Sequence, residues 1–138
     1  MPFNLQARAE SFCRKLYVRW PALVHETKSS GGEVARFLLK VNIPVESGNA
    51  AAKAGKLGET IQSILADLKP EAVYFTDNNG QRSGFIFLEM QDASQIPAIA
   101  EPWFLAFDAS IEIHPVMVPD DLARAGDAIE KAVKKYAL

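Results

Sequence analysis

The sequence predicts an α+β domain built on one antiparallel sheet of four strands, and three observations support this class. Four segments alternate apolar and polar residues, which is the period of a strand with one buried face. Apolar residues at helical spacing follow the first and the third of these segments. A short turn containing Asn and Gly joins the second segment to the third. The resulting order is strand, helix, strand, strand, helix, strand, followed by a C-terminal helix.

The first strand is expected over residues 36–43, where apolar residues occupy every second position. Pro44 ends this strand, because proline has no N–H group to donate to a central ladder. Ser47 is the expected N-cap of a short helix through residues 50–54. A longer helix is expected over residues 57–68, with one apolar stripe. The stripe consists of Leu57, Ile61, Ile64, Leu65 and Leu68.

Residues 71–76 and 82–90 are the arms of the clearest hairpin in the chain. They flank residues 77–80, Asp-Asn-Asn-Gly, whose side chains accept the positive φ values of a tight turn. After the hairpin, either Asp92 or Ser94 is expected to cap a helix that runs to about residue 100.

Pro102 is expected to start a separate helical turn through residues 103–107, because proline is accepted at a helix start. The last strand is expected over residues 109–118, with Glu112 and His114 on one face. The C-terminal helix begins near Pro119. Its apolar stripe consists of Leu122, Ala125, Ile129, Val133 and Tyr136.

Residues 1–33 are poorly patterned and carry a net positive charge, whereas residues 34–138 carry a net negative charge. We therefore predict an N-terminal extension over 1–33 and one domain over 34–138. One hypothesis is that residues 1–33 are a translated leader. Gly31-Gly32-Glu33 is compatible with a purine-rich ribosome-binding site, and Val34 with a GTG start codon.

Composition excludes several classes of function. The net charge of -2 argues against nucleic-acid binding, which usually needs a clustered basic face. No apolar run approaches the roughly 20 residues of a membrane span. The single cysteine, Cys13, cannot form an internal disulfide, and we expect a cytoplasmic protein. The two histidines lie in separate segments, so we expect no metal site and no bound cofactor.

The alternation assigns the strand residues to two faces of the sheet. One face is almost entirely apolar and is expected to lie under the helices. The other face mixes apolar and polar side chains, so it is too apolar to be left in water and too polar for a dry core. We interpret it as a face that pairs with a second sheet around a partly polar cavity. Its expected members are Leu38, Lys40, Asn42, Tyr74, Thr76, Phe85, Phe87, Glu89, Glu112 and His114.

This order is that of the split βαβ, or ferredoxin-like, fold, βαββαβ. Together with RFLLKVNIP at 36–44, KPEAVYF at 69–75 and IPAIAEPWF at 96–104, it resembles small uncharacterised bacterial proteins of the dimeric α/β-barrel superfamily. The resemblance covers residues 34–137. It implies that two subunits place their sheets face to face and enclose a ligand cavity. Relatives include cofactor-independent monooxygenases, muconolactone isomerases and haem-degrading enzymes, so the resemblance does not determine an activity.

His114 is the candidate catalytic residue, as a general base or proton donor, with Glu112 as its partner. The alternative for His114 is a packed, hydrogen-bonded side chain, and for Glu112 an interface salt bridge with Lys40. Trp103 is a candidate pocket wall, or else a core or dimer-contact residue. Asn42 and Tyr74 either bind a ligand or complete a buried network. The candidate ligand-binding residues are Lys40, Asn42, Tyr74, Phe85, Phe87, Glu89 and Trp103.

Three functions remain open on the sequence. The first is a homodimeric barrel that binds a small organic molecule in its cavity, with a cofactor-independent monooxygenase- or isomerase-like enzyme using His114 as the alternative. The second is a non-catalytic dimeric module in which the same polar residues stabilise the interface. The third is haem binding through His114.

Overall fold

A computed structural model of the chain describes residues 34–137. The chain divides into two units, Met1–Gly31 and Gly32–Leu138, and the described residues all belong to the second. The predicted extension over residues 1–33, including its interpretation as a leader, lies outside the described residues.

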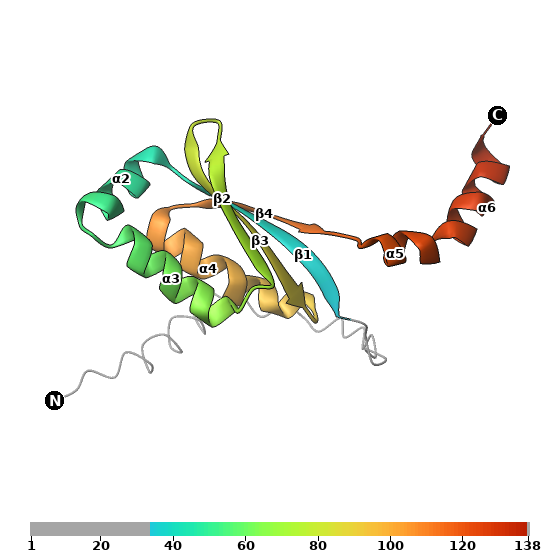
Figure 1. The fold of residues 1–138 in the computed structure, drawn as a ribbon, viewed down its shortest axis with the longest axis horizontal. Helices are drawn as coiled ribbons and strands as arrows, with labels where there is room; N and C mark the ends of the chain where they lie inside the picture. The colour runs from blue at the N-terminus through green and yellow to red at the C-terminus, as the bar shows by residue number, and fades with distance from the viewer. Residues whose placement is uncertain (1–33, 138) are drawn as a thin grey trace, which may run out of the picture. The chain divides into compact units, whose positions relative to one another are not determined.

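The described unit contains one antiparallel sheet of four strands, as the sequence predicts (Figure 1). The strand order is β2-β3-β1-β4, and each neighbouring pair is antiparallel. Because β1 and β3 lie inside the sheet, β2 and β4 are its edges. The strands are β1 (Ala35–Ile43), β2 (Ala72–Asn78), β3 (Gln81–Met90) and β4 (Ser110–Pro115).

Helices α2, α3 and α4 lie on one side of this sheet (Figure 1). The predicted order of strands and crossover helices is therefore confirmed, in an α+β unit whose sheet is open rather than closed into a barrel. Within residues 34–137 no helix combines the length and the apolar character that crossing a bilayer requires. The helices are α2 (Val45–Lys53), α3 (Leu57–Leu68), the 3₁₀ turn η1 (Ala93–Gln95), α4 (Ile96–Phe107), α5 (Pro119–Arg124) and α6 (Gly126–Tyr136).

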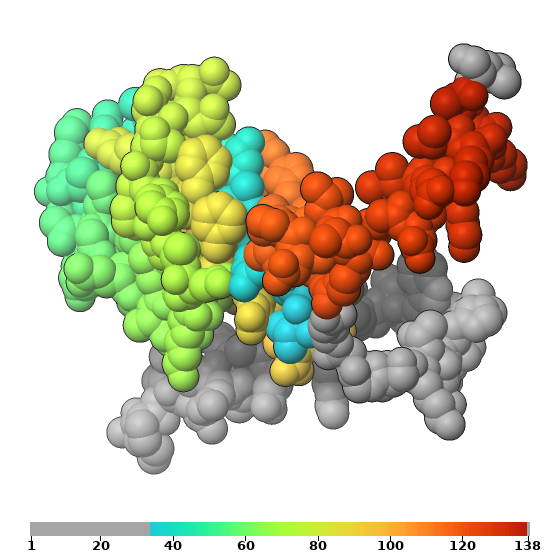
Figure 2. Space-filling model, turned by 45° about the vertical axis from the view of Figure 1, so that its right-hand side comes forward, coloured from blue at the N-terminus to red at the C-terminus, as the bar shows by residue number. Residues whose placement is uncertain are grey.

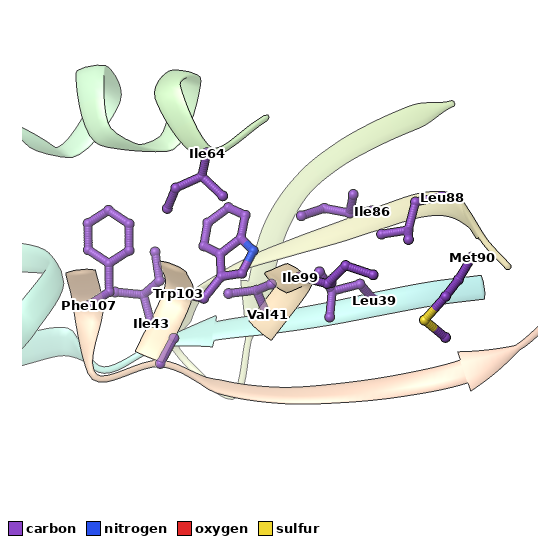
Figure 3. Packing of buried hydrophobic residues seen from close by; sticks show 11 residues of the cluster. Leu39, Val41, Ile43, Ile64, Ile86, Leu88, Met90, Ile99, Trp103 and Phe107 are labelled. Atoms are coloured by element: carbon purple, nitrogen blue, oxygen red, sulfur yellow. The ribbon is translucent and has the colours of Figure 1, made fainter. Parts of the chain in front are cut away.

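The hydrophobic core lies between the sheet and helices α3 and α4 (Figure 3). Leu39 and Val41 of β1 and Ile86 of β3 are fully buried there, together with Trp103 and Phe107 of α4. The alternation in the sequence assigned these strand residues to the helix-covered face. Phe75 belongs to the same alternating set but remains 62% exposed, because it lies on the edge strand β2.

The hairpin turn has the backbone that its sequence predicts. Asn79 and Gly80 have φ values of 52° and 77°. Positive φ at both central residues is the requirement of a two-residue turn whose twist matches that of the flanking strands. The turn therefore sets the register of β2 against β3.

Two helix boundaries differ from the prediction. Helix α2 begins at Val45, since the Gly48 N–H donates to the Pro44 carbonyl at 2.9 Å. Ser47 therefore lies inside the helix, where its hydroxyl donates to Asp108 Oδ2 at 3.2 Å instead of capping. The predicted C-terminal helix is divided into α5 and α6 at Ala125. The glycine that follows, Gly126, costs about 1 kcal/mol relative to alanine inside a helix, which favours a break there.

Helix α4 continues through Pro102, where a separate turn was expected. A proline inside a helix costs about 3 kcal/mol, because one hydrogen bond is lost and the ring crowds the preceding turn. The continuous helix places Ile99, Trp103 and Phe107 on one buried face at intervals of four residues. Burying such a side chain contributes about 1.5–3 kcal/mol, so the three together outweigh the cost of the proline.

Candidate functional site

The candidate site lies on the face of the sheet opposite α3 and α4, which we call the open face. The register of the strands arranges its side chains in rows that cross the sheet. In one row, Tyr74 pairs with Phe85, Phe85 with Lys40, and Lys40 with Glu112. The next row contains Ala72, Phe87, Leu38 and His114. In both rows the aromatic residues lie toward β2 and β3 and the charged or ionisable ones toward β1 and β4.

Three residues at the β1–β4 end of these rows form a charged cluster, defined as Lys40, Glu112 and His114. The Lys40 ammonium lies 3.4 Å from Glu112 Oε2. His114 Nε2 lies 2.8 Å from the same oxygen. The Lys40 side chain is 25% exposed, and those of Glu112 and His114 are about half exposed. The sequence predicted that these residues share a face, and the structure brings them into direct contact.

The electrostatics of the cluster follow from these contacts. The hydrogen bond from His114, and then the hydrogen bond and charge of Lys40, hold the pKa of the Glu112 carboxyl below its ordinary value. The carboxylate is therefore ionised at neutral pH and accepts hydrogen bonds only. His114 therefore donates to it through Nε2, and Nδ1 is an acceptor only when the ring is neutral.

Beside the charged cluster lies an aromatic patch, defined as Tyr74, Phe85 and Phe87. The rings of Tyr74 and Phe87 meet edge to face, with centroids 6.4 Å apart. The Lys40 ammonium lies 6.0 Å from the centre of the Phe85 ring, within the range of a cation–π contact. Tyr74 is 64% exposed. Figure 2 shows β3 residues at the surface between β2 and β1.

Asn42 occupies a neighbouring row but is turned into the protein. Its side-chain oxygen accepts from Ser83 Oγ at 2.8 Å and from Asn78 Nδ2 at 3.0 Å. Asn42 is only 8% exposed and Ser83 4%. Of the two roles considered for Asn42, these contacts favour the buried network over ligand binding.

Glu89 lies at the other end of the open face, opposite Arg36 in the β1–β3 register. The Arg36 guanidinium forms two hydrogen bonds with Glu71, at 2.6 Å and 2.9 Å. These bonds and the opposite charge of the partner raise the pKa of Arg36 and lower that of Glu71. The row of Leu38 and Phe87 separates Glu89 from Lys40 and Glu112. The sequence did not reveal the Arg36–Glu71 pair, because no local spacing connects the two residues.

The structure does not bring Trp103 to the open face. Trp103 is 1% exposed and lies in the core, on the helix-covered side of the sheet. Of the roles considered for Trp103, this burial favours a core residue over a wall of the same cavity as Tyr74 and Phe85. Its position follows from the continuous helix α4, which turns Trp103 toward the core.

Within residues 34–137, no group of three or more His, Cys, Asp or Glu side chains is placed to hold a metal ion. The charged cluster has only one carboxylate and one imidazole, together with a cationic lysine. Its arrangement suits hydrogen bonding and proton transfer rather than metal ligation.

Comparison with known proteins gives one result. No curated protein and no solved structure matches the chain significantly. A protein-family model, described as a domain of unknown function (DUF3303), matches residues 35–130. This range includes all four strands of the sheet and every residue of the charged cluster and aromatic patch. Because the match covers well over half of the chain, the protein belongs to the DUF3303 family.

Proposed function

We propose that this protein is a homodimer that pairs through the open face and binds a small organic molecule in the enclosed space. The observation that carries the proposal is the row Tyr74–Phe85–Lys40–Glu112, which places an aromatic patch directly beside a charged cluster. Leaving the aromatic part of this face in water is unfavourable in free energy, because its apolar surface stays hydrated. A second sheet covers its apolar part while the polar part contacts a ligand.

The chemistry of the open face favours a second copy of the chain as the partner. Lys40 and Glu112 put both signs of charge on neighbouring strands. In a two-fold symmetric pair each copy presents the same patch, so a face with both signs is complementary to itself. The aromatic patch supplies the apolar contact area that stable interfaces need.

The charged cluster then supplies the polar contacts for the ligand. Lys40 donates hydrogen bonds, the Glu112 carboxylate accepts them, and His114 Nδ1 is a further acceptor. This set suits a small organic molecule that carries a hydroxyl group next to a carbonyl or carboxylate oxygen. The rings of Phe85 and Phe87 provide walls for its apolar part.

A specific observation supports the enzymatic alternative, a cofactor-independent monooxygenase- or isomerase-like activity. The 2.8 Å contact with Glu112 fixes the tautomer of His114 and leaves Nδ1 available to remove a proton from a substrate. In that case His114→Ala abolishes turnover without abolishing binding or dimerisation. In a purely structural dimer, His114→Ala weakens association and has no other effect.

Native mass spectrometry of the protein purified from its own host tests the proposal, since it reports oligomeric state and bound mass together. We expect a dimer that carries an additional small-molecule mass. A monomer with nothing bound would contradict both parts of the proposal. A dimer without bound mass, unchanged by solutes with adjacent hydroxyl and carboxylate groups such as salicylate, would support the structural module instead.

A further inference from the structure

A cavity lies between the sheet and helices α3 and α4, away from the charged cluster. Its volume is about 230 Å³, and its walls come from β1, β2, β3, α3 and α4. Val41, Ile43, Ile61 and Phe75 make these walls largely apolar. Trp103, which is 1% exposed, is part of the lining.

The indole N–H of Trp103 has no hydrogen-bond partner, although it is buried. It is the one such buried side-chain nitrogen or oxygen among the described residues. Figure 3 shows the indole ring between Ile64 of α3 and Val41 of β1, neither of which offers a side-chain acceptor. An unsatisfied buried donor costs about 1–3 kcal/mol, so native proteins generally provide an acceptor for it.

Water is a poor candidate for that acceptor. A buried water molecule needs about two to four polar partners. The lining has two hydroxyl groups: Thr76 is an exposed residue, and the Ser83 hydroxyl proton is already engaged with the Val41 carbonyl at 2.9 Å and with Asn42 Oδ1 at 2.8 Å. The other walls near Trp103 are mostly hydrocarbon. A molecule with an apolar body and a single acceptor matches this lining better than water does.

The dimensions and charge of the cavity narrow the class of ligand. A dry cavity of about 150 Å³ holds benzene, so about 230 Å³ holds one six-membered ring with a small substituent. The lining contains Arg82 but no carboxylate, which disfavours a cationic ligand. Phe75 of β2 and Arg82 of β3 are both exposed, so the cavity opens to solvent beside these two residues.

We propose that this cavity binds a small, mainly apolar ring compound whose single oxygen accepts a hydrogen bond from Trp103 Nε1. The proposal is independent of the proposed dimer face, because the lining of this cavity shares no residue with the charged cluster or the aromatic patch. The glycine in β3, Gly84, forms part of the lining, where it contributes no side chain to the cavity. Glycine inside a strand often marks a place where a ligand approaches closely.

The test uses the indole ¹H–¹⁵N signals of the full chain and two probes of matched shape, cyclohexanone and methylenecyclohexane. The chain has two tryptophans, and Trp20→Phe identifies the signal of Trp103. We expect cyclohexanone to shift the Trp103 indole proton downfield in a saturable way. It should bind about tenfold more tightly than methylenecyclohexane, the ratio that one hydrogen bond provides. The absence of a saturable shift, or equal affinities for the two probes, would overturn the proposal.

A variant that fills the cavity tests whether cyclohexanone binds there. Ile61→Phe places a larger side chain on the α3 wall and should abolish the cyclohexanone shift. Ile129→Phe makes the same exchange on α6, at a 50% exposed residue, and should retain the shift. If Ile61→Phe does not fold, Gly84→Ala replaces it, because the added carbon would lie in ordinary contact with Phe75 at 3.6 Å. Gly84→Ala should weaken cyclohexanone binding severalfold, and unchanged binding in a folded cavity variant would contradict the proposed site.

Discussion

Glu112 Oε2 lies 2.8 Å from His114 Nε2, two residues further along the same strand. Residues at this spacing point to the same face of a sheet, so the contact is built into the strand and needs no loop to position it. The same carboxylate contacts Lys40 on the neighbouring strand. Glu112 therefore links the imidazole to the ammonium, and its ionisation controls the whole cluster.

Acid should weaken the fold through Glu112. Its pKa in the folded chain is lowered, so its contribution is complete above the unfolded-state value of about 4.3 and is lost as the pH falls through the folded-state value. We expect the free energy of unfolding in urea to fall less steeply below about pH 4.3 in Glu112→Gln than in the wild type. Glu101→Gln on α4 removes the same charge elsewhere and serves as the control. An identical acid slope in wild type and Glu112→Gln would show that the contacts of Glu112 do not contribute.

The proposed dimer should depend on the aromatic patch. Phe87→Asp puts a charge among half-buried rings on the open face, where dimerisation would bury it without a partner. We expect association to weaken by about 2 kcal/mol or more, as for a central interface residue. Sedimentation velocity over a range of concentrations measures this change.

Leu105→Asp is the matched control for that experiment, since Leu105 is 81% exposed and lies on α4, outside the open face. It should leave the association unchanged. Equal weakening by the two variants, or a Phe87→Asp chain that associates like the wild type, would place any dimer contact elsewhere.

Asn42 should act on stability and not on ligand binding. Asn42→Ala removes the acceptor of two hydrogen bonds in a part-buried region. Asn78 Nδ2 loses this partner, whereas the Ser83 hydroxyl keeps the Val41 carbonyl as its acceptor. We expect a loss of about 1–3 kcal/mol in the free energy of unfolding. Ser110→Ala, at an exposed position opposite Asn42 on β4, should cost much less. Chemical denaturation measures both losses, and a negligible effect of Asn42→Ala would contradict the network.

The local pattern of the sequence was enough to predict the sheet and much of the charged cluster. Period-two alternation assigned Lys40, Glu112 and His114 to one face, because parity along a strand decides which side a residue takes. The hairpin could be predicted from Asn79 and Gly80, because Asn and Gly are the residue types that most readily adopt the positive φ values of such a turn. These features depend on neighbours within a few positions of the chain.

Features that depend on several elements at once were not predictable in this way. The contacts of Asn42 require the register of three strands, and the position of Trp103 requires a helix that continues through Pro102. Local propensity treats that proline as a break, whereas the burial of Trp103 and Phe107 favours the continuous helix. The cavity beside Trp103 depends on the register of the strands and on the continuous helix α4, so it became apparent only in the structure.

Leu38 and Leu39 provide the last prediction, since adjacent residues of β1 face opposite sides of the sheet. Leu39 is fully buried in the core, whereas Leu38 lies half-buried on the open face beside Phe87 and His114. Leu39→Ala should lower the free energy of unfolding by about 2–5 kcal/mol, whatever the protein concentration, because it leaves a cavity in the core. Leu38→Ala should cost less in dilute solution, and its effect should grow as the concentration rises and the wild type dimerises. Denaturation at two concentrations measures the difference. An effect of Leu38→Ala that does not change with concentration would argue against pairing through the open face.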